Sequence, residues 1–151
     1  MYFVDRKTIE ETLRHMEKIV DRFCSQSEWT SETERLALER IAHLVIESVI
    51  DVGNSMIDGF IMRDPGSYED IVDILIDENV VDEADGQSLK ALIACRKLVV
   101  QAYTAIDHQQ LKQTFDQHVE AVKRFPERVR TYLEKELGPV SAFLPETDRH
   151  A

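Results

Sequence analysis

Residues that break helices are scarce in this sequence, since 5 of its 151 residues are glycine and 4 are proline. So few turn-forming residues argue against a β-sandwich, a β-barrel or a low-complexity chain. Cysteine is scarce as well. Cys24 and Cys95 are too few for a disulfide framework and lack the spacing of a metal site. We therefore predict two free thiols in a reducing cytosol.

Basic residues and long apolar runs are also in short supply. Lysine and arginine number 18 against 29 aspartates and glutamates, which gives a formal net charge of -11. This excess of acid argues against broad binding to nucleic acids or anionic membranes, but it leaves room for a small basic site. Glu47, Asp51 and Lys97 interrupt the longest apolar stretches, and Asp5 precedes any segment that could form a signal peptide. We predict a cytoplasmic protein without a membrane span.

The sequence does contain the pattern of long amphipathic helices, in which apolar residues recur every three or four positions. Ser31 and Glu34 are typical of a capping box, and Ser67 is a second candidate cap. Gly138, followed by proline, is typical of a helix end. The predicted helices cover about 5–24, 31–60, 67–75, 82–103 and 107–137.

These helices predict an all-α fold, an up-and-down bundle of about five helices joined by short loops. Pro126 lies inside the last helix and should kink or split it. At this length folding hides roughly 70% of the chain's surface, which is enough for one domain with its own core. We expect that domain to cover residues 1–137, followed by a short, loosely ordered tail over 138–151.

One basic residue falls on an otherwise apolar helical seam. The seam alternates steps of three and four and comprises Leu89, Leu92, Arg96, Val99, Tyr103 and Ile106. Arg96 is its single charged member, and a guanidinium is costly to desolvate unless a carboxylate or a ligand anion meets it. Arg96 could form an ion pair with an acid on a neighbouring helix, which spacing alone favours, or bind a phosphate with its planar fork.

The predicted helix over 31–60 offers acids that could meet Arg96. A polar stripe on this helix comprises Glu47, Asp51, Asn54 and Asp58. Asp51 and Asn54 lie at the edge of the apolar face, so we expect them to line a site with Arg96. We expect Glu47 and Asp58 to face solvent, as polar stripes usually do.

Metal and nucleophile motifs are missing. Glu39, His43 and Glu47 are each four residues apart and share one helical face. They lack the Glu-x-x-His spacing that metal-binding bundles repeat on two helices, so we predict no metal ligands and no cofactor. The sequence also lacks a phosphate-cradling glycine loop and a serine-centred elbow.

Three segments nevertheless point to one protein family. They are Arg96-Lys97-Leu98-Val99-Val100-Gln101-Ala102-Tyr103, the stretch 38–54, and the turn Arg63-Asp64-Pro65-Gly66-Ser67-Tyr68. Together they resemble the HepT-like proteins of the HEPN superfamily, in particular its YutE-like branch, over most of the chain. The resemblance implies a helical bundle that dimerises and acts as a ribonuclease toxin. It also implies a nucleotidyltransferase antitoxin, which silences the toxin by adding AMP to a tyrosine.

The family motif is an arginine, four to six further residues, a histidine, and a tyrosine two residues later. Arg96 matches the arginine and Tyr103 the AMP acceptor, but the histidine position falls on Gln101. Glutamine cannot transfer protons, and the loss of general acid–base help lowers a rate about 10²- to 10⁴-fold. His108 lies twelve residues after Arg96, roughly 18 Å along one helix, which is too far unless the chain folds back or a second subunit approaches.

The resemblance leaves two functions open. In the first, the protein is a metal-independent ribonuclease toxin with Arg96, Gln101 and Asp51 as catalytic residues. Arg96 would stabilise phosphate charge, Gln101 would orient the scissile group, and Asp51 would hold Arg96. In the second, catalysis is lost and the protein binds a nucleotidyltransferase or RNA as a regulatory module. Gln101 and the acidic charge favour the second function, whereas Arg96 and Tyr103 favour the first. A purely structural bundle is a third alternative.

The same reasoning gives expectations for assembly, activity and the position of the tyrosine. We expect a symmetric homodimer, because the apolar face of the 31–60 helix is broad and a composite site needs two copies. We expect weak or absent nuclease activity, which Gln101→His raises. We expect Tyr103 at a surface cleft, about 10 Å from Arg96 on the same helical face. The alternative is a core tyrosine whose hydroxyl reaches an acid.

Overall fold

Side-chain caps set the starts of the first two helices in the computed structural model, which describes residues 3–139. α1 (Arg6–Ser25) starts where the Asp5 carboxylate accepts a hydrogen bond from a backbone N–H of the first turn. α2 (Glu32–Gly59) starts at a complete capping box, in which Ser31 and Glu34 each accept from the other's backbone. The predicted capping box is therefore confirmed.

The other three helices are α3 (Tyr68–Asp77), α4 (Glu83–Ala94) and α5 (His108–Leu137). Each starts at a serine or aspartate whose side chain accepts from the backbone three residues later, namely Ser67, Asp82 and Asp107. No strand occurs between residues 3 and 139, so the all-α prediction with about five helices is confirmed.

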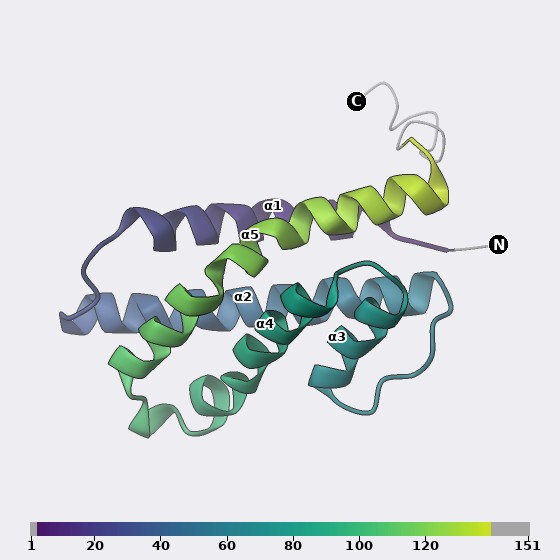
Figure 1. Ribbon diagram of the computed structural model, residues 1–151. Helices are drawn as coiled ribbons and strands as arrows, with labels where there is room; N and C mark the ends of the chain where they lie inside the picture. The colour runs from purple at the N-terminus through teal and green to yellow at the C-terminus, as the bar shows by residue number, and fades with distance from the viewer. Residues whose placement is uncertain (1–2, 140–151) are drawn as a thin grey trace.

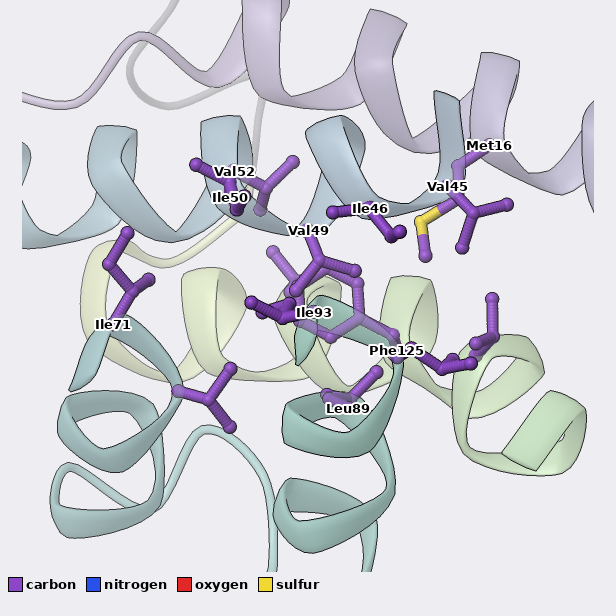
Figure 2. Close-up of a cluster of buried hydrophobic side chains, with 14 of the residues drawn as sticks. Met16, Val45, Ile46, Val49, Ile50, Val52, Ile71, Leu89, Ile93 and Phe125 are labelled. Carbon is purple, nitrogen blue, oxygen red and sulfur yellow. The ribbon is translucent and has the colours of Figure 1, made fainter. Parts of the chain in front are cut away.

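α2 is the central helix and packs against each of the other four. Figure 1 shows α1 lying along α2 on one side, α3 and α4 on the opposite side, and α5 crossing in front. Apolar side chains from all five helices meet between them (Figure 2), including Met16, Val45, Val49, Ile71, Leu89, Ile93 and Phe125. The broad apolar face of α2 is thus covered within one chain, so this face gives no argument for a dimer.

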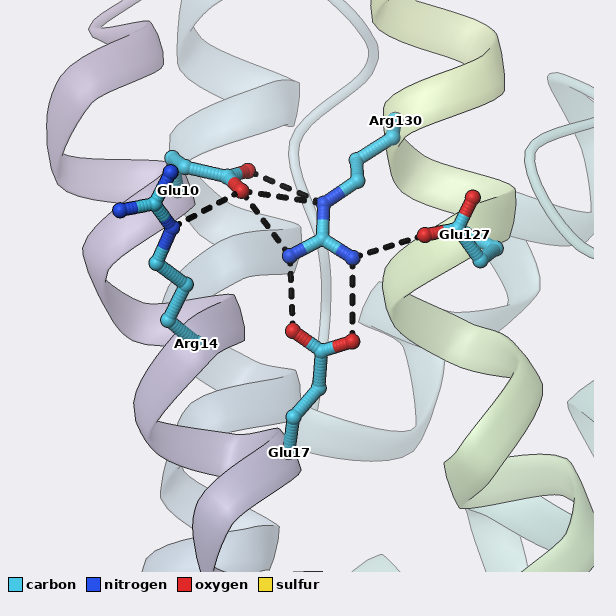
Figure 3. Close-up of polar contacts among 5 residues, drawn as sticks. All are labelled: Glu10, Arg14, Glu17, Glu127 and Arg130. Atoms are coloured by element: carbon cyan, nitrogen blue, oxygen red, sulfur yellow. Dashed lines mark hydrogen bonds and ion pairs between the residues drawn. The ribbon is translucent and has the colours of Figure 1, made fainter.

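A guanidinium joins the first and last helices at the surface. Arg130 of α5 bonds Glu10 and Glu17 of α1, with its shortest contact to each near 2.9 and 2.8 Å, and also Glu127 on its own helix (Figure 3). The hydrogen bond from Arg130 lowers the pKa of Glu17. This network fixes the two ends of the chain against each other.

The predicted helix over 82–103 is wrong in its second half. α4 ends at Ala94, and the chain continues as a π-helical turn, η1 (Lys97–Gln101), and a 3₁₀ turn, η2 (Tyr103–Ala105). Within 97–105 only Val99 is buried, so there is little apolar surface to hold a regular helix against the core. The wider π turn rotates the following residues away from the α4 face.

Pro126 does not split α5, which continues through it and changes direction near its middle (Figure 1). Gly138 ends the helix with a positive φ of 80°, as the sequence predicted for this position. Most of the predicted 138–151 tail lies outside the described residues. Over residues 3–139, no helix is long and apolar enough to span a bilayer.

Candidate active site

Arg96 lies where α4 gives way to η1, and its Nε donates a 2.8 Å hydrogen bond to Oε1 of Glu47 on α2. The guanidinium carbon also stacks over the Tyr68 ring, 4.5 Å from its centroid. The bond to Glu47 raises the pKa of Arg96. The arginine side chain is 22% exposed, and its two terminal nitrogens make no hydrogen bond to any residue in 3–139. These two nitrogens are therefore available as a fork for an anion.

The expected contact between Asp51 and Arg96 is wrong, because Glu47 holds the arginine instead. α4 ends beside the turn of α2 that carries Glu47, whereas Asp51 lies one turn further along and faces α1. Asp51 lines a cavity of about 340 Å³ together with Thr8, Ile9, Thr12, Val52, Asn54, Ser55 and Asp58. Partial burial, with a smaller effect from the nearby Glu47 charge, raises the pKa of Asp51. Asn54 lies in the same cavity and not beside Arg96, and the expectation of a solvated Glu47 is also wrong.

Two imidazoles reach the same side of α2. His43 Nε2 lies 4.0 Å from Glu47 Oε1, and its Nδ1 lies 3.3 Å from a terminal nitrogen of Arg40. His108, the first residue of α5, places Nε2 2.7 Å from Oε2 of Glu39. The chain folds back after α4, which is the condition named for an approach of His108, so the distance of roughly 18 Å along one continuous helix does not apply. The regular spacing of Glu39, His43 and Glu47 was visible in the sequence, but it gave no hint of these partners.

Gln101 and Tyr103 both lie at the surface. Gln101 ends η1 and is exposed, and Tyr103 begins η2 with 64% of its surface exposed. Tyr103 is exposed as predicted, and the alternative of a core tyrosine is wrong. Its position at a cleft stays a prediction. The predicted 10 Å spacing from Arg96 assumed one continuous α-helix, which the structure does not have.

The residues on this side therefore form a polar face, here called the Arg96 face. It comprises Glu39, Arg40, His43, Glu47, Tyr68, Arg96 and His108. It offers two guanidiniums, two imidazoles and two carboxylates, which are groups that can bind an anion and transfer protons. Across the described residues, no three histidine, cysteine or acidic side chains are grouped as metal ligands.

Comparison with known proteins places this geometry in a family context. The family model for ribonuclease HepT-like proteins matches residues 9–129. A Bacillus subtilis (strain 168) protein named "Putative RNase YutE" is 57% identical over 143 residues, which are 95% of this chain and 99% of that protein. A solved structure of Bacillus subtilis YutE, described as a cytosolic protein of unknown function, aligns with a TM-score of 0.92. It shares 57% identity and covers 95% of this chain and 100% of its own.

More distant solved structures share the fold. A tri-AMPylated HEPN toxin of Shewanella oneidensis in complex with an MNT antitoxin aligns with a TM-score of 0.69 at 17% identity, covering 82% of this chain and 95% of that one. A toxin–antitoxin structure with AMP-PNP aligns with a TM-score of 0.70 at 15% identity, covering 82% and 96%. At this identity the likeness concerns the fold alone. The family match over residues 9–129 and the 57% identity to YutE establish that the chain belongs to the ribonuclease HepT-like family.

Proposed function

We propose that this protein is a ribonuclease that cleaves RNA without a metal ion at the Arg96 face. The observation that carries the proposal is the free fork of Arg96, whose Nε is held by Glu47 while its terminal nitrogens make no hydrogen bond within residues 3–139. Preorganised donors of this kind stabilise the charge that develops on a phosphate during cleavage, because they need no reorientation in the transition state. Tyr68, stacked on the guanidinium, limits its movement.

The acidic charge of the whole chain suits a localised site. A net charge of -11 provides little general attraction for RNA, so binding depends on the few cations that one surface collects. Arg40 and Arg96 both lie on the Arg96 face and provide this local positive charge. A short single-stranded segment with one well-placed phosphate is the substrate that this surface suits best.

The toxin role and its control are part of the proposal. Tyr103 is the residue we propose as the AMP acceptor, because its hydroxyl-bearing ring is exposed and it stands two residues after the motif position occupied by Gln101. The Shewanella oneidensis HEPN toxin is described as tri-AMPylated and bound to an MNT antitoxin, which supports a nucleotidyltransferase partner for this chain. The added phosphate would compete with RNA for Arg96. We place the protein in the cytosol, as YutE is described.

The second candidate is a binding module without catalysis. The observation that favours it is Gln101, an exposed amide at the position where the family motif carries its histidine. An amide can orient a phosphate but cannot take up or release a proton at neutral pH. In this alternative the Arg96 face binds RNA or the nucleotidyltransferase and leaves the RNA intact.

Turnover of a fluorogenic RNA in buffer with EDTA decides between the two candidates. The purified wild type is expected to cleave slowly, because Gln101 replaces the motif histidine, and Arg96→Ala should lower kcat/KM by a further factor of about 10² to 10³, as for the loss of one oxyanion donor. Cleavage that survives Arg96→Ala would contradict the assigned site. RNA binding by a wild type that does not cleave would favour the binding module.

A further inference from the structure

Gln101 stands where the family motif has its histidine, so the proposed ribonuclease lacks an evident proton acceptor. We propose that His43 of α2 fills this role and acts as the general base that takes the proton of the RNA 2′-hydroxyl. The inference rests on the ribonuclease function proposed above and assigns it a residue outside the family motif. Two observations support the assignment. His43 and Arg96 both lie near the same oxygen of Glu47, and the partners of the two ring nitrogens of His43 indicate which nitrogen carries the proton.

His43 and Arg96 converge on one oxygen atom. Nε2 of His43 and Nε of Arg96 lie 4.0 and 2.8 Å from Oε1 of Glu47, so these two nitrogens are at most 6.8 Å apart. Nδ1 lies across the ring from Nε2, so the arginine fork and Nδ1 are separated by about the length of one ribose–phosphate unit. A single phosphodiester can therefore contact the arginine fork while its neighbouring ribose hydroxyl meets the imidazole.

The partners of His43 fix its tautomer and make Nδ1 the ring nitrogen that can accept a proton. Arginine can only donate, so the 3.3 Å contact from Arg40 makes Nδ1 the acceptor and leaves the ring proton on Nε2. Arg40 is exposed, so a ribose hydroxyl can displace it from Nδ1. Nε2 faces the carboxylate of Glu47, which would stabilise the imidazolium that forms when Nδ1 gains a proton.

The reaction can be written with every atom placed. Nδ1 of His43 removes the 2′-hydroxyl proton, the 2′-oxygen bonds to phosphorus, and the bond from phosphorus to the 5′-oxygen breaks. Arg96 balances the charge on the non-bridging oxygens, and water supplies the proton that the leaving 5′-oxygen takes up. The products are a 2′,3′-cyclic phosphate and a 5′-hydroxyl. The imidazolium then returns its proton to solvent.

The other imidazoles are less well placed. His108 is held by Glu39, which lies two helical turns before Glu47, roughly 12 Å away along α2. His118 bonds Ser88 between α4 and α5, and His15 is exposed on α1 without a link to Arg96. The groups that set the charge around His43 are Arg40, Glu39 and Glu47 on α2, Arg96 before η1, and His108 on α5.

The test compares wild type, His43→Gln, His108→Gln and the matched control His15→Gln on a fluorogenic RNA with EDTA. We expect His43→Gln to lower kcat by about 10²- to 10⁴-fold. Its Kd for a non-cleavable 2′-deoxy analogue should stay unchanged, since the imidazole is not needed to bind phosphate. The fall in rate at acidic pH that wild type shows should be absent in His43→Gln. The products of wild type should carry 2′,3′-cyclic phosphate ends. His15→Gln should match wild type.

The outcomes separate the two levels of the proposal. A wild type that does not cleave would overturn the ribonuclease function and this inference together. An active wild type whose rate, and its fall at acidic pH, survive His43→Gln would overturn only the role of His43, and a loss confined to His108→Gln would move the base to that residue. Rescue of His43→Gln by a substrate with a 5′-thiolate leaving group would show that His43 protonates the leaving group, which contradicts the assignment as base.

Discussion

Gln101 is the residue whose chemistry departs furthest from the family motif. It lies at the exposed end of η1, where a histidine side chain can be accommodated without disturbing the core. A histidine there would add a second group that transfers protons near neutral pH, beside the base already proposed at His43. Cleavage of RNA needs one proton removed and one donated, so the added group can take the second task.

We therefore expect Gln101→His to raise kcat on fluorogenic RNA by about tenfold to 10²-fold, within the range of acid–base catalysis. Gln113→His, an exposed position on α5, is the matched control and should leave the rate unchanged. The measurement is single-turnover cleavage with EDTA across pH 5 to 8. An unchanged rate with Gln101→His would mean that the end of η1 does not approach the scissile phosphate.

Tyr103 is the second residue with a separate prediction. Its exposure allows a nucleotidyltransferase to reach the hydroxyl without unfolding the bundle. Co-expression with a nucleotidyltransferase encoded beside this gene should add AMP to Tyr103, and Tyr103→Phe should abolish the added mass. Tyr68→Phe, which removes another partly exposed hydroxyl, should still be modified. Intact mass and peptide mapping read the result, and an unmodified Tyr103 beside an active partner would refute the assignment.

The sequence predicted which residues belong to the candidate site better than it predicted which residues contact each other. Arg96 was singled out because a charge on an apolar seam requires a partner, and the structure supplies an ion pair. The partner itself depended on where α4 ends relative to α2, a tertiary quantity that spacing along one helix does not contain. The contacts of Glu47 with Arg96 and His43 were missed for the same reason.

At the scale of elements, the start of α3 carries a local clamp. The Asp70 carboxylate accepts two hydrogen bonds from Arg63 and one from the Gly66 backbone, which together lower its pKa to about 2. The folded-state pKa lies below the ordinary value of 3.8, so the folded form binds this proton less readily than the unfolded form. The clamp therefore stabilises the fold fully above about pH 4 and loses this effect as the pH falls toward about 2.

Replacing Asp70 with asparagine removes the titrating group. It should therefore change how the free energy of unfolding depends on pH in the acidic range. We expect Asp70→Asn to be less stable than wild type at pH 7, with the difference shrinking as pH falls and vanishing near pH 2. Urea unfolding followed by circular dichroism at several pH values measures this. Asp21→Asn, an exposed position on α1, is the control. A difference that stays constant with pH would show that Asp70 acts through packing and not through its charge.

Helix starts were more predictable than helix ends. Capping by Ser31 and Ser67 is a local interaction between neighbours in sequence, so the residues alone disclose it. The end of α4 has no proline or glycine, and its apolar seam continues through Val99 to Ile106 in the sequence. Val99 is buried and Ile106 packs partly against the core, but Tyr103 between them is exposed and the regular α-helix ends at Ala94. Only the packing of the complete bundle decides this.

At the scale of the whole molecule, the Arg96 face retains apolar surface that the bundle does not cover. Leu36 is 58% exposed and lies on the same stripe of α2 as Arg40, His43 and Glu47, at steps of four, three and four. Tyr68, which stacks on Arg96, is also exposed. An apolar residue beside a site with unused polar groups is the composition of an isologous interface that two copies share.

We therefore predict a homodimer built on the Arg96 face, which brings two copies of the site together. Light scattering coupled to gel filtration should give twice the 17.5 kDa chain mass for wild type. Leu36→Lys should shift the mass toward one chain, because it places a charge in the apolar part of the interface. Ile61→Lys is the control, an exposed apolar residue just beyond the opposite end of α2, and should leave the dimer intact. A wild-type mass of one chain at all concentrations would rule out the shared site, and a dimer that Leu36→Lys leaves unchanged would move the interface to another face.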